Sequence, residues 1–507
     1  MKQLSLTPGT VTLADLRDVW AGAPIELAPA AWQAIDAASE AIARIVASGR
    51  TVYGVNTGFG LLAQTRIPAD RLAELQTNLI LSHSCGLGEA LEPRVVRLII
   101  ALKAIGLGRG HSGVRRIVVE RLLALLEADA LPVIPAQGSV GASGDLAPLA
   151  HLAAAMLGEG LIQLGDELLP AGQALARLGL EPLQLGPKEG LALINGTQVS
   201  TALALDALFA GERVFASALL AGALSTDALK GTDAAFDPRI HAARGQPGQI
   251  DVAEVLRGLL EGSEIRRSHD SCERVQDPYS FRCQPQVMGA SLDLIRAAAR
   301  TLEIEANAVT DNPVLFPDAD DSLSGGNFHA QPVAFAADML AMALCEVGSI
   351  SERRTAVLVD PKMSGLPPFL IEDSGVNSGF MIAQVTAAAL VSENRTLAFP
   401  ASVDSIPTSA GQEDHVSMAT HGAMKARRIA ANAAGVIGVE LLAAAQGIDF
   451  HAPLTSSPPL HATWTAIRAD VPRHDRDRYL AGDLAWAKRT VLDGGLSGDV
   501  ERRLFAR

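Results

Sequence analysis

Long apolar stretches of helical spacing run through most of this chain and limit what it can fold into. Such stretches occupy residues 198–223, 285–309, 331–355, 382–397 and 416–446. As continuous helices they would reach about 30 to 45 Å in length. Alternating apolar and polar residues, which would indicate strands, are rare. The sequence therefore predicts an all-α (mainly α) protein, a large bundle of long and mostly buried helices with any sheet small.

Composition fits a bundle whose helices approach one another closely. Hydrophobic residues make up 48% of the chain and aromatic residues only 4%, so the core must consist mostly of Ala, Leu, Val and Ile. Residues 95–105 and 114–126 carry apolar side chains on more than one face, which is typical of helices buried on several sides. No linker rich in Pro, Ser or charge interrupts residues 1–507. We expect a single large helical domain, with active-site loops between its helices.

Charge and cysteine content argue against several classes of protein. The net charge is −14 and no Lys/Arg block stands out, so neither nucleic acid nor an anionic membrane is an expected partner. The least charged long stretch, residues 374–392, contains Asn377 and Gln384, and we expect a buried helix there rather than a membrane span. The N-terminus lacks the apolar run of a signal peptide. The cysteines are scattered without a C-x-x-C pair, which favours reduced thiols and a cytoplasmic location: Cys85, Cys272, Cys283 and Cys345.

Residues 138–151 read Gly-Ser-Val-Gly-Ala-Ser-Gly-Asp-Leu-Ala-Pro-Leu-Ala-His, and their centre can form an electrophile from its own backbone. If the chain turns tightly at Ser143, the amide nitrogen of Gly144 can attack the carbonyl carbon of Ala142 and close a five-membered ring. Loss of water at the new ring carbon, and of the Ser143 hydroxyl with its α-proton, leaves an exocyclic methylidene. That group is a carbon electrophile, which no ordinary side chain provides.

The residues around this turn suit the same chemistry. Gly144 has no Cβ to crowd the attack, and Gly141 permits backbone angles closed to other residues. Asp145 can hold the turn by accepting backbone N–H bonds. The simpler interpretation is a loop that leads into a helix beginning near Leu146, because short motifs also match by chance.

The longer context resembles the aromatic amino acid ammonia-lyase and aminomutase family. Its members form 4-methylideneimidazol-5-one (MIO) at Ala-Ser-Gly within a Gly-Ser-x-x-Ala-Ser-Gly-Asp-Leu-x-Pro-Leu sequence. The resemblance extends from Tyr53-Gly-Val-Asn-Thr-Gly-Phe-Gly60 to Gln412-Glu-Asp-His-Val-Ser-Met418. It implies a carbon–nitrogen lyase whose only cofactor is MIO, formed autocatalytically from Ala142, Ser143 and Gly144. It also implies a homotetramer with active sites built from several subunits.

The substrate expectation depends on Ser82-His83 and Glu413. Family members that act on phenylalanine or tyrosine have Phe-Leu or His-Leu where this chain has Ser82-His83, and phenylalanine lyases usually have Gln at the Glu413 position. An imidazole substrate needs a donor or acceptor for its ring nitrogens, which His83 and Glu413 can supply, whereas a buried carboxylate beside an apolar ring would be costly. The resemblance therefore implies deamination of L-histidine to trans-urocanate and ammonia, the first step of histidine degradation.

The resemblance assigns roles to further residues. Tyr53, in the N-terminal part of about residues 1–110 that also carries His83, is the expected general base for the β-proton. Arg282 can bind the substrate carboxylate through its planar fork. The expected catalytic residues are Tyr53, Ala142, Ser143, Gly144, Asn195, Tyr279, Arg282 and Glu413. The expected substrate-binding residues are His83, Asn195, Gln276, Arg282, Phe328 and Glu413.

Simpler interpretations exist for each of these residues. Asn195-Gly is often only a turn, Arg282 can form a structural ion pair, and a lone His or Tyr is usually structural. The histidines show no metal-ligand spacing, and no phosphate-binding or dinucleotide fingerprint is present, so no metal is expected. Two positions depart from the family pattern: Gly411 replaces a common Asn, and Arg395 replaces a common Lys.

Three alternatives stay open at this point. The first is a tyrosine or phenylalanine lyase or aminomutase of the same family. The second is an eliminase of the fumarase and aspartase type, whose Gly-Ser-Ser-x-Met-Pro loop is absent. The third is a catalytically inactive helical scaffold, which would be expected to have lost at least one of Tyr53, Ser143, Tyr279 and Arg282.

Overall fold

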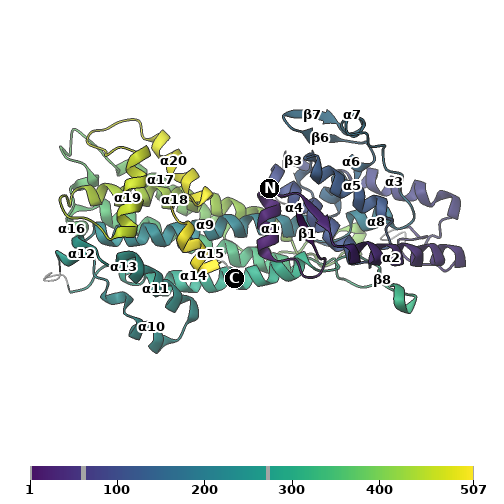
Figure 1. The fold of residues 1–507 in the computed structure, drawn as a ribbon, viewed down its shortest axis with the longest axis horizontal. Coiled ribbons are helices and arrows are strands. Elements are labelled where there is room, and N and C mark those ends of the chain that lie inside the picture. The colour runs from purple at the N-terminus through teal and green to yellow at the C-terminus, as the bar shows by residue number, and fades with distance from the viewer. Residues whose placement is uncertain (1–2, 59–63, 270–274, 506–507) are drawn as a thin grey trace. The chain divides into compact units, whose positions relative to one another are not determined.

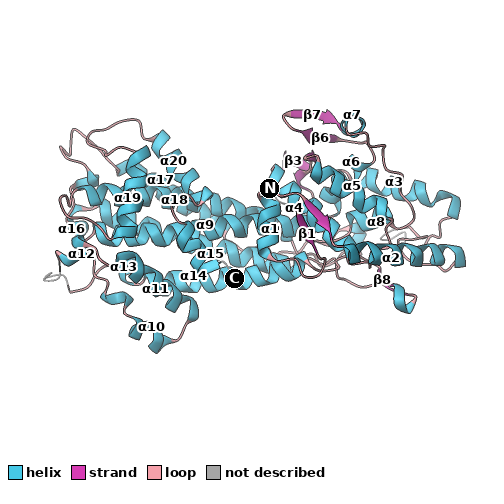
Figure 2. Cartoon of the chain, in the orientation of Figure 1, coloured by secondary structure: helices cyan, strands magenta, loops and turns pink. Residues whose placement is uncertain are grey.

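The computed structural model describes residues 3–58, 64–269 and 275–505, and its regular structure is mostly helical (Figures 1 and 2). The mainly α prediction is confirmed. Phe59 and Gly60, which end the Tyr53 motif, and Cys272 lie outside the described residues. The described strands are three or four residues long: β1 (Leu4–Leu6), β2 (Ile25–Leu27), β3 (Leu87–Ala90), β4 (Ala130–Pro132), β5 (Pro135–Gln137), β6 (Leu161–Leu164), β7 (Glu167–Pro170), β8 (Val314–Phe316) and β9 (Asp321–Leu323). They pair as parallel β1–β2, antiparallel β3–β5 and β8–β9, and an antiparallel sheet of order β4-β6-β7.

The chain divides into two compact units, each built from three separate segments. The first unit contains Met1–Asp206, Ala299–Asp338 and Pro400–Met424, and the second contains the remaining segments, Ala207–Ala298, Met339–Phe399 and Lys425–Arg507. Helices that lie wholly in the first unit are α1 (Leu13–Trp20), α2 (Pro29–Ser48), η2 (Ala69–Arg71), α3 (Leu72–His83), α4 (Pro93–Gly108), α5 (Arg116–Glu127), α6 (Leu146–Met156), α7 (Ala171–Arg177), α8 (Glu189–Ile194), η4 (Pro317–Ala319) and η6 (Ser409–Gly411).

Four long helices have residues in both units, so the units share continuous backbone: α9 (Gln198–Ala228), α14 (Gln284–Ala306), α15 (Gln331–Val359) and α18 (Ala419–Asp449). Helices wholly in the second unit are η3 (Ala234–Phe236), α10 (Pro238–Arg244), α11 (Pro247–Leu260), α12 (Glu264–Arg267), α13 (Tyr279–Arg282), α16 (Pro361–Ser364), η5 (Pro368–Leu370), α17 (Met381–Leu397), α19 (Pro458–Asp470), α20 (Ala481–Asp493) and α21 (Gly498–Phe505). That residues 1–507 act as one domain stays a prediction.

Most of the helices expected from the sequence are present, with shifted ends. Helix α4 is buried from Val95 to Gly108, as predicted, but α5 buries mainly one face and leaves Ile117 39% exposed. Helix α6 begins at Leu146, as expected. The prediction of a buried helix over 374–392 is wrong, because α17 begins only at Met381 and buries only part of its surface. Asp373 adopts a positive φ of 49° just before this stretch, and the residues up to Phe380 form turns.

Small residues let the long helices of the second unit pack closely. A Cβ at Gly222 of α9 would lie 2.1 Å from Oε1 of Gln284 in α14, so a larger residue would displace the end of this side chain. Gly348 of α15 faces Ala433 of α18, whose Cβ would lie 3.7 Å from an added Cβ. A charged pair is buried between two of these helices. Arg354 of α15 donates two hydrogen bonds to Glu440 of α18, at 2.5 and 2.8 Å. The abundant Ala and Gly therefore serve close helix packing.

Among the residues that the structure describes, three helices are long and apolar enough to cross a membrane by length and composition: α9, α15 and α18. Their most apolar windows are 94%, 67% and 89% buried inside the protein, respectively. Much of the apolar surface of these helices is therefore covered by the chain itself.

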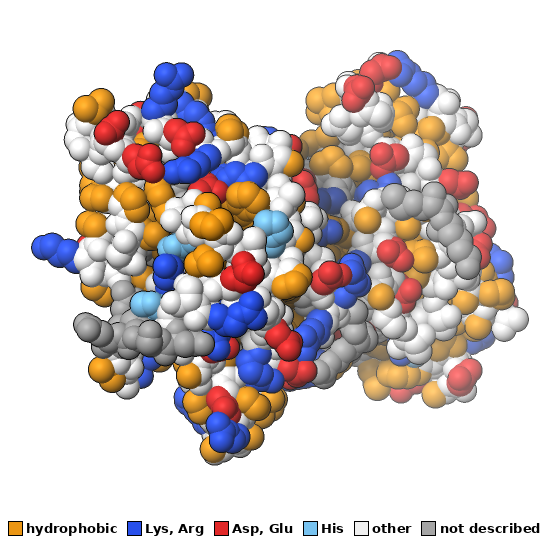
Figure 3. Space-filling view, turned by 60° about the vertical axis from the view of Figure 1, so that its left-hand side comes forward, with side chains coloured by type: hydrophobic (Ala, Val, Ile, Leu, Met, Phe, Trp, Pro, Cys, Tyr) orange, Lys and Arg blue, Asp and Glu red, His pale blue; other side chains and the backbone are white. Residues whose placement is uncertain are grey.

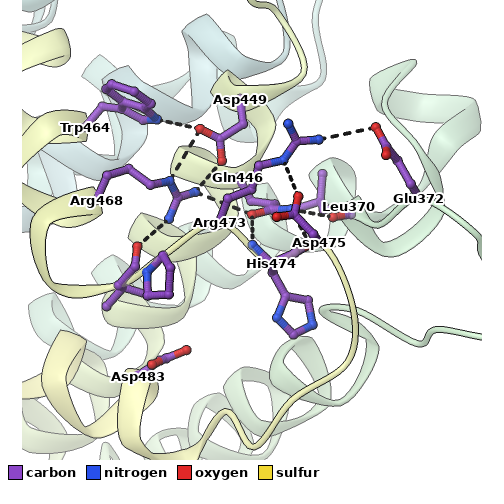
Figure 4. A network of polar contacts seen from close by, with 12 residues as sticks. Leu370, Glu372, Gln446, Asp449, Trp464, Arg468, Arg473, His474, Asp475 and Asp483 are labelled. Carbon is purple, nitrogen blue, oxygen red and sulfur yellow. Dashed lines mark hydrogen bonds and ion pairs between the residues drawn. The ribbon is translucent and has the colours of Figure 1, made fainter.

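A polar network ties the end of α18 to the segments after α19 in the second unit (Figure 4). The Arg468 guanidinium and the Trp464 indole both donate to the Asp449 carboxylate, at 2.7 and 2.8 Å. The Gln446 amide donates to the carbonyls of Leu370 and His474, at 3.1 and 3.0 Å, and accepts from the His474 N–H at 3.0 Å. The Gln446 side chain of α18 thus satisfies backbone groups of Leu370, in η5, and of His474, in the segment after α19.

The surface carries charges of both signs in close alternation. Figure 3 shows Lys and Arg side chains interspersed with Asp and Glu over the face in view, with hydrophobic side chains between them. No large single-sign patch is visible on this face, in agreement with the absence of a Lys/Arg block in the sequence.

Candidate active site

Two neighbouring cavities in the first unit are lined by most of the residues that the sequence singled out. One has a volume of about 600 Å³ and the other of about 630 Å³. Both are lined by Tyr53, Ser143, Asn195, Ser409 and Glu413. Ala142 and Phe328 line only the first, and His83 lines only the second. The sequence motifs, far apart along the chain, therefore meet at one place.

The turn at Ser143 joins β5 to α6 and is enclosed by the backbone of Gly196 on one side and the side chain of Ser417 on the other. Gly144 has a φ of +75°, and a Cβ there would lie 2.1 Å from the carbonyl oxygen of Gly196. Gly141 has a φ of +68°, and a Cβ there would lie 2.2 Å from the Ser417 hydroxyl. Both glycines are therefore required by conformation and by space. Ala142 is 6% exposed and packs with Val416 and Met418.

The Asp145 side chain connects this turn to the start of α9. Its buried carboxylate accepts hydrogen bonds from the hydroxyls of Ser139, Thr420 and Ser200, at 2.8, 2.7 and 2.9 Å. It also accepts the backbone N–H of Ser200 at 2.7 Å, in the first turn of α9. We expected Asp145 to hold the turn by accepting backbone N–H bonds, but the N–H group that it accepts belongs to Ser200 of α9, and Ser139 of the turn contacts it through a hydroxyl.

Asn195 follows α8 and contacts the Ser143 backbone directly. Its Nδ2 donates to the Ser143 carbonyl at 3.0 Å. Its Oδ1 is buried and lacks a hydrogen-bond partner among the residues that the structure describes. Asn195 is 4% exposed, so it presents a fixed donor to the Ser143 carbonyl.

Glu413 lies opposite the turn on a loop with unusual backbone angles. Ser409, Ala410 and Gly411 have φ values of 50°, 55° and 85° in succession. A positive φ is costly for residues other than glycine, which accounts for Gly at 411 and suggests a functional constraint on its neighbours. The hydroxyls of Thr408 and Ser409 donate to Oε2 of Glu413 at 2.6 and 2.8 Å. The loop thus holds the carboxylate in one orientation.

The Ser143 hydroxyl completes this arrangement by donating to Oε1 of Glu413 at 2.7 Å. Burial alone would raise the pKa of the Glu413 carboxyl, but the hydroxyls of Thr408, Ser143 and Ser409 together lower that pKa below its ordinary value. Glu413 is therefore a carboxylate at neutral pH.

His83 is the last residue of α3, and its half-buried ring lines the same cavity as Glu413. Burial lowers the pKa of the His83 imidazole, and the nearby Glu413 charge opposes that shift only in part. The neutral ring lies 3.1 Å from the Ser82 hydroxyl through Nδ1. A neutral imidazole offers both a donor and an acceptor to a ligand.

Tyr53 and Phe328 come from loops. Tyr53 follows α2 in a turn and lines both cavities, and Phe328 lies in the loop before α15. The rings of His329 and His415, which the sequence did not single out, stack 5.7 Å apart on the wall of the first cavity. Nothing in their spacing along the sequence signals that contact.

Gln276, Tyr279 and Arg282 belong to the second unit, and they are not among the residues that line these cavities. Gln276 is exposed, and the Tyr279 ring is 71% exposed. The Arg282 guanidinium lies 4.6 Å from the centre of the Tyr279 ring, a cation–π contact. Its buried Nε has no hydrogen-bond partner within the described part of the chain.

Three other residues with structural importance were not predicted: Thr408, Ser409 and Lys103. The first two orient Glu413, and Lys103 hydrogen-bonds the Asn195 carbonyl at 2.8 Å. Hydroxyl residues in a loop and a lysine in an apolar helix carry no distinctive pattern. Within the described residues, no group of three or more His, Cys, Asp or Glu side chains is placed to hold a metal ion.

The chain and its fold are similar to those of known proteins. Residues 11–469 match the family described as aromatic amino acid lyase. The chain is 59% identical to a histidine ammonia-lyase of Burkholderia pseudomallei, over 97% of each chain. Its fold is similar to that of a histidine ammonia-lyase of Trypanosoma cruzi, with a TM-score of 0.92, 43% identity and coverage of 99% of this chain and 96% of that one. It is also similar to a tyrosine aminomutase of Streptomyces globisporus, with a TM-score of 0.90, 36% identity and coverage of 97% and 98%.

Proposed function

Since this chain belongs to the aromatic amino acid lyase family, we propose that it removes ammonia from L-histidine to form trans-urocanate, as the first step of histidine degradation. The observation that carries this proposal is the single site at which Ser143, Glu413 and His83 meet. One of these residues belongs to the electrophile-forming tripeptide, and the other two are the pair that distinguishes histidine from phenylalanine and tyrosine.

The electrophile is MIO, formed by the chain itself from Ala142, Ser143 and Gly144. The tight turn supports this proposal. Gly144 has a φ of +75° and no space for a Cβ, so no side chain crowds its nitrogen. The Asn195 amide, 3.0 Å from the Ser143 carbonyl, is placed to stabilise charge on the ring carbonyl that this oxygen becomes. Once formed, MIO supplies a methylidene carbon that accepts electrons from the substrate.

Binding and proton transfer fall to other side chains. His83 and Glu413 bind the imidazole, the neutral ring as donor or acceptor and the carboxylate as acceptor of an N–H. Tyr53 takes the β-proton, and Phe328 packs on the substrate ring. The carboxylate of the substrate is bound by Arg282, with help from Gln276. Tyr279 and Asn195 support the electrophile.

Because Gln276, Tyr279 and Arg282 lie in the second unit, we propose that they reach the cavity of a neighbouring subunit in a homotetramer. Large hydrophobic side chains that are exposed in the single chain support assembly, among them Ile382 and Val385 of α17, at 63% and 51% exposure. The histidine-degrading reaction and the scattered thiols favour a cytoplasmic enzyme.

A tyrosine or phenylalanine lyase or aminomutase is the nearest alternative, since solved structures of that kind share the fold. The carboxylate at 413 disfavours it, because a partly buried carboxylate beside an apolar ring gains no hydrogen bond from the substrate. Purified protein incubated separately with L-histidine and L-tyrosine should form urocanate and no coumarate, followed by near-ultraviolet absorbance. Coumarate alone would keep the family and overturn the role of His83 and Glu413. The formation of neither urocanate nor coumarate would favour an inactive scaffold.

A further inference from the structure

Lys103 is a charged side chain enclosed within the first unit, and none of the proposed chemistry uses it. It lies in α4, where every residue from Val95 to Gly108 is buried, and it is 1% exposed. A buried ammonium is unfavourable unless hydrogen-bonded or paired. Its presence in this buried helix therefore calls for specific contacts.

Those contacts are two backbone carbonyls at the end of α8. The Lys103 Nζ donates to the carbonyl oxygen of Ala192 at 3.1 Å and to that of Asn195 at 2.8 Å. The last carbonyls of a helix have no partner within the helix, and a positive charge is favourable there. Lys103 thus fixes the point at which α8 ends and Asn195 begins.

The path continues from Asn195 to the turn that forms the electrophile. The Asn195 side chain donates to the Ser143 carbonyl at 3.0 Å. Only one residue therefore separates the Lys103 ammonium from the oxygen on which negative charge would develop. Since Asn195 is also buried, movement of its backbone would move the amide relative to Ser143.

The charges near Lys103 leave its ammonium free for this role. Lys188 pairs with Asp311 at 2.7 Å, and Asp145 accepts hydrogen bonds from three hydroxyls and an N–H. Burial lowers the pKa of Lys103 to about 7, with Lys188 adding to this shift and Asp311 and Asp145 opposing it. In either protonation state, the N–H groups of Lys103 are directed at the carbonyl oxygens of Ala192 and Asn195.

We propose that Lys103 is a positioning residue that acts on the Ser143 carbonyl through Asn195, both while the tripeptide cyclises and during turnover. The inference rests on the proposed function. In the absence of Lys103, the end of α8 loses its donor and the Asn195 amide loses its fixed distance to Ser143.

The test is a double-mutant cycle with Lys103→Met, Asn195→Ala and the combined variant. Intact mass gives the fraction of chain that has lost two waters, and kcat and KM for L-histidine are measured per cyclised chain. Lys103→Met should lower kcat about tenfold or more with KM within about threefold, and should lower the cyclised fraction. If Lys103 acts through Asn195, the combined variant should have the same kcat and the same cyclised fraction as Asn195→Ala alone.

A matched control is Arg97→Met, which removes another buried cation from α4. Arg97 is 8% exposed and hydrogen-bonds Asp129 and the carbonyls of Gly22 and Ala23, away from the turn. It should lower Tm but leave the cyclised fraction and kcat per cyclised chain unchanged. If Lys103→Met does not fold, Lys103→Gln, a neutral donor, takes its place in the cycle.

The results separate the two proposals. Wild-type chain that neither loses two waters nor forms urocanate would overturn the proposed function. Wild-type chain that does both, alongside a Lys103→Met variant equal to it, would overturn only the role of Lys103. The role of Lys103 would also be overturned if Lys103→Met lowered kcat or the cyclised fraction further in the Asn195→Ala background, or if Arg97→Met caused the same losses.

Discussion

The Ser143 hydroxyl donates a 2.7 Å hydrogen bond to the Glu413 carboxylate, across 270 residues of sequence. The contact exists in the uncyclised chain, so the residue that would become the electrophile and the residue that would read the imidazole are adjacent before any chemistry occurs. Thr408 and Ser409 hold the same carboxylate from the other side, at 2.6 and 2.8 Å. The fold thus places the proposed substrate-binding carboxylate beside the proposed site of covalent chemistry.

Glu413→Gln should lower kcat/KM for L-histidine by about 100-fold. Hydrogen bonds to a charged group contribute about 1.5–3 kcal/mol each, and about 1.4 kcal/mol corresponds to a factor of ten. Steady-state kinetics would measure this, with Glu89→Gln on the exposed strand β3 as the control. A Glu413→Gln variant with wild-type kcat/KM would remove the carboxylate from the account.

Gly144→Ala should prevent cyclisation, because its Cβ would lie 2.1 Å from the Gly196 carbonyl oxygen. Gly179→Ala is the matched control, with a φ of +68° and no atom within 4 Å of an added Cβ. Both substitutions impose strain at positive φ, but only the first should abolish the loss of two waters in the intact mass. Full cyclisation in Gly144→Ala would show that this turn can relax.

Arg282→Lys should raise KM for L-histidine by about tenfold or more, with a smaller effect on kcat. Lysine keeps the charge but cannot reproduce the two parallel hydrogen bonds of a guanidinium to a carboxylate. Arg244→Lys, at the exposed end of α10, is the control. Equal KM values for wild type and Arg282→Lys would exclude Arg282 from carboxylate binding.

Protein stability should depend on His83 at mildly acidic pH. Burial lowers the pKa of His83 below about 6.5, so the unfolded state binds a proton more readily than the folded state. The contribution of neutral His83 is present above pH about 6.5 and is lost as pH falls through the folded-state pKa. The Tm of His83→Gln minus the Tm of wild type should therefore be larger at about pH 5.5 than at about pH 8. The same Tm difference at both values would contradict a buried neutral ring.

The sequence predicted the helical class, and it singled out Ser143 and several residues that line the same cavities, for identifiable reasons. Long apolar periods mark helices, and Ala142, Ser143 and Gly144 belong to a motif long enough to be specific. The roles of Gly141 and Gly144 were also anticipated, although the collision of a Gly144 Cβ with Gly196 was not. That contact joins segments 52 residues apart in sequence and depends on how α8 and α9 meet.

Other features could not be predicted from the sequence. The hydrogen bonds that orient Glu413 depend on backbone angles of Ser409 and Ala410 that only the surrounding loop imposes. Lys103 is one lysine in an apolar helix, and its role depends on where α8 ends. Residues 374–392 have a helical composition, yet the backbone turns at Asp373 delay the helix to Met381.

The central claim is that Ala142, Ser143 and Gly144 form the electrophile, and intact mass tests it most directly. Denatured wild-type protein should be lighter than its sequence by two waters. Ser143→Ala should fold with an unchanged circular dichroism spectrum, have the full mass of its sequence and show almost no turnover of L-histidine. A wild-type chain that forms urocanate at full mass, or a Ser143→Ala variant that retains activity, would contradict the account.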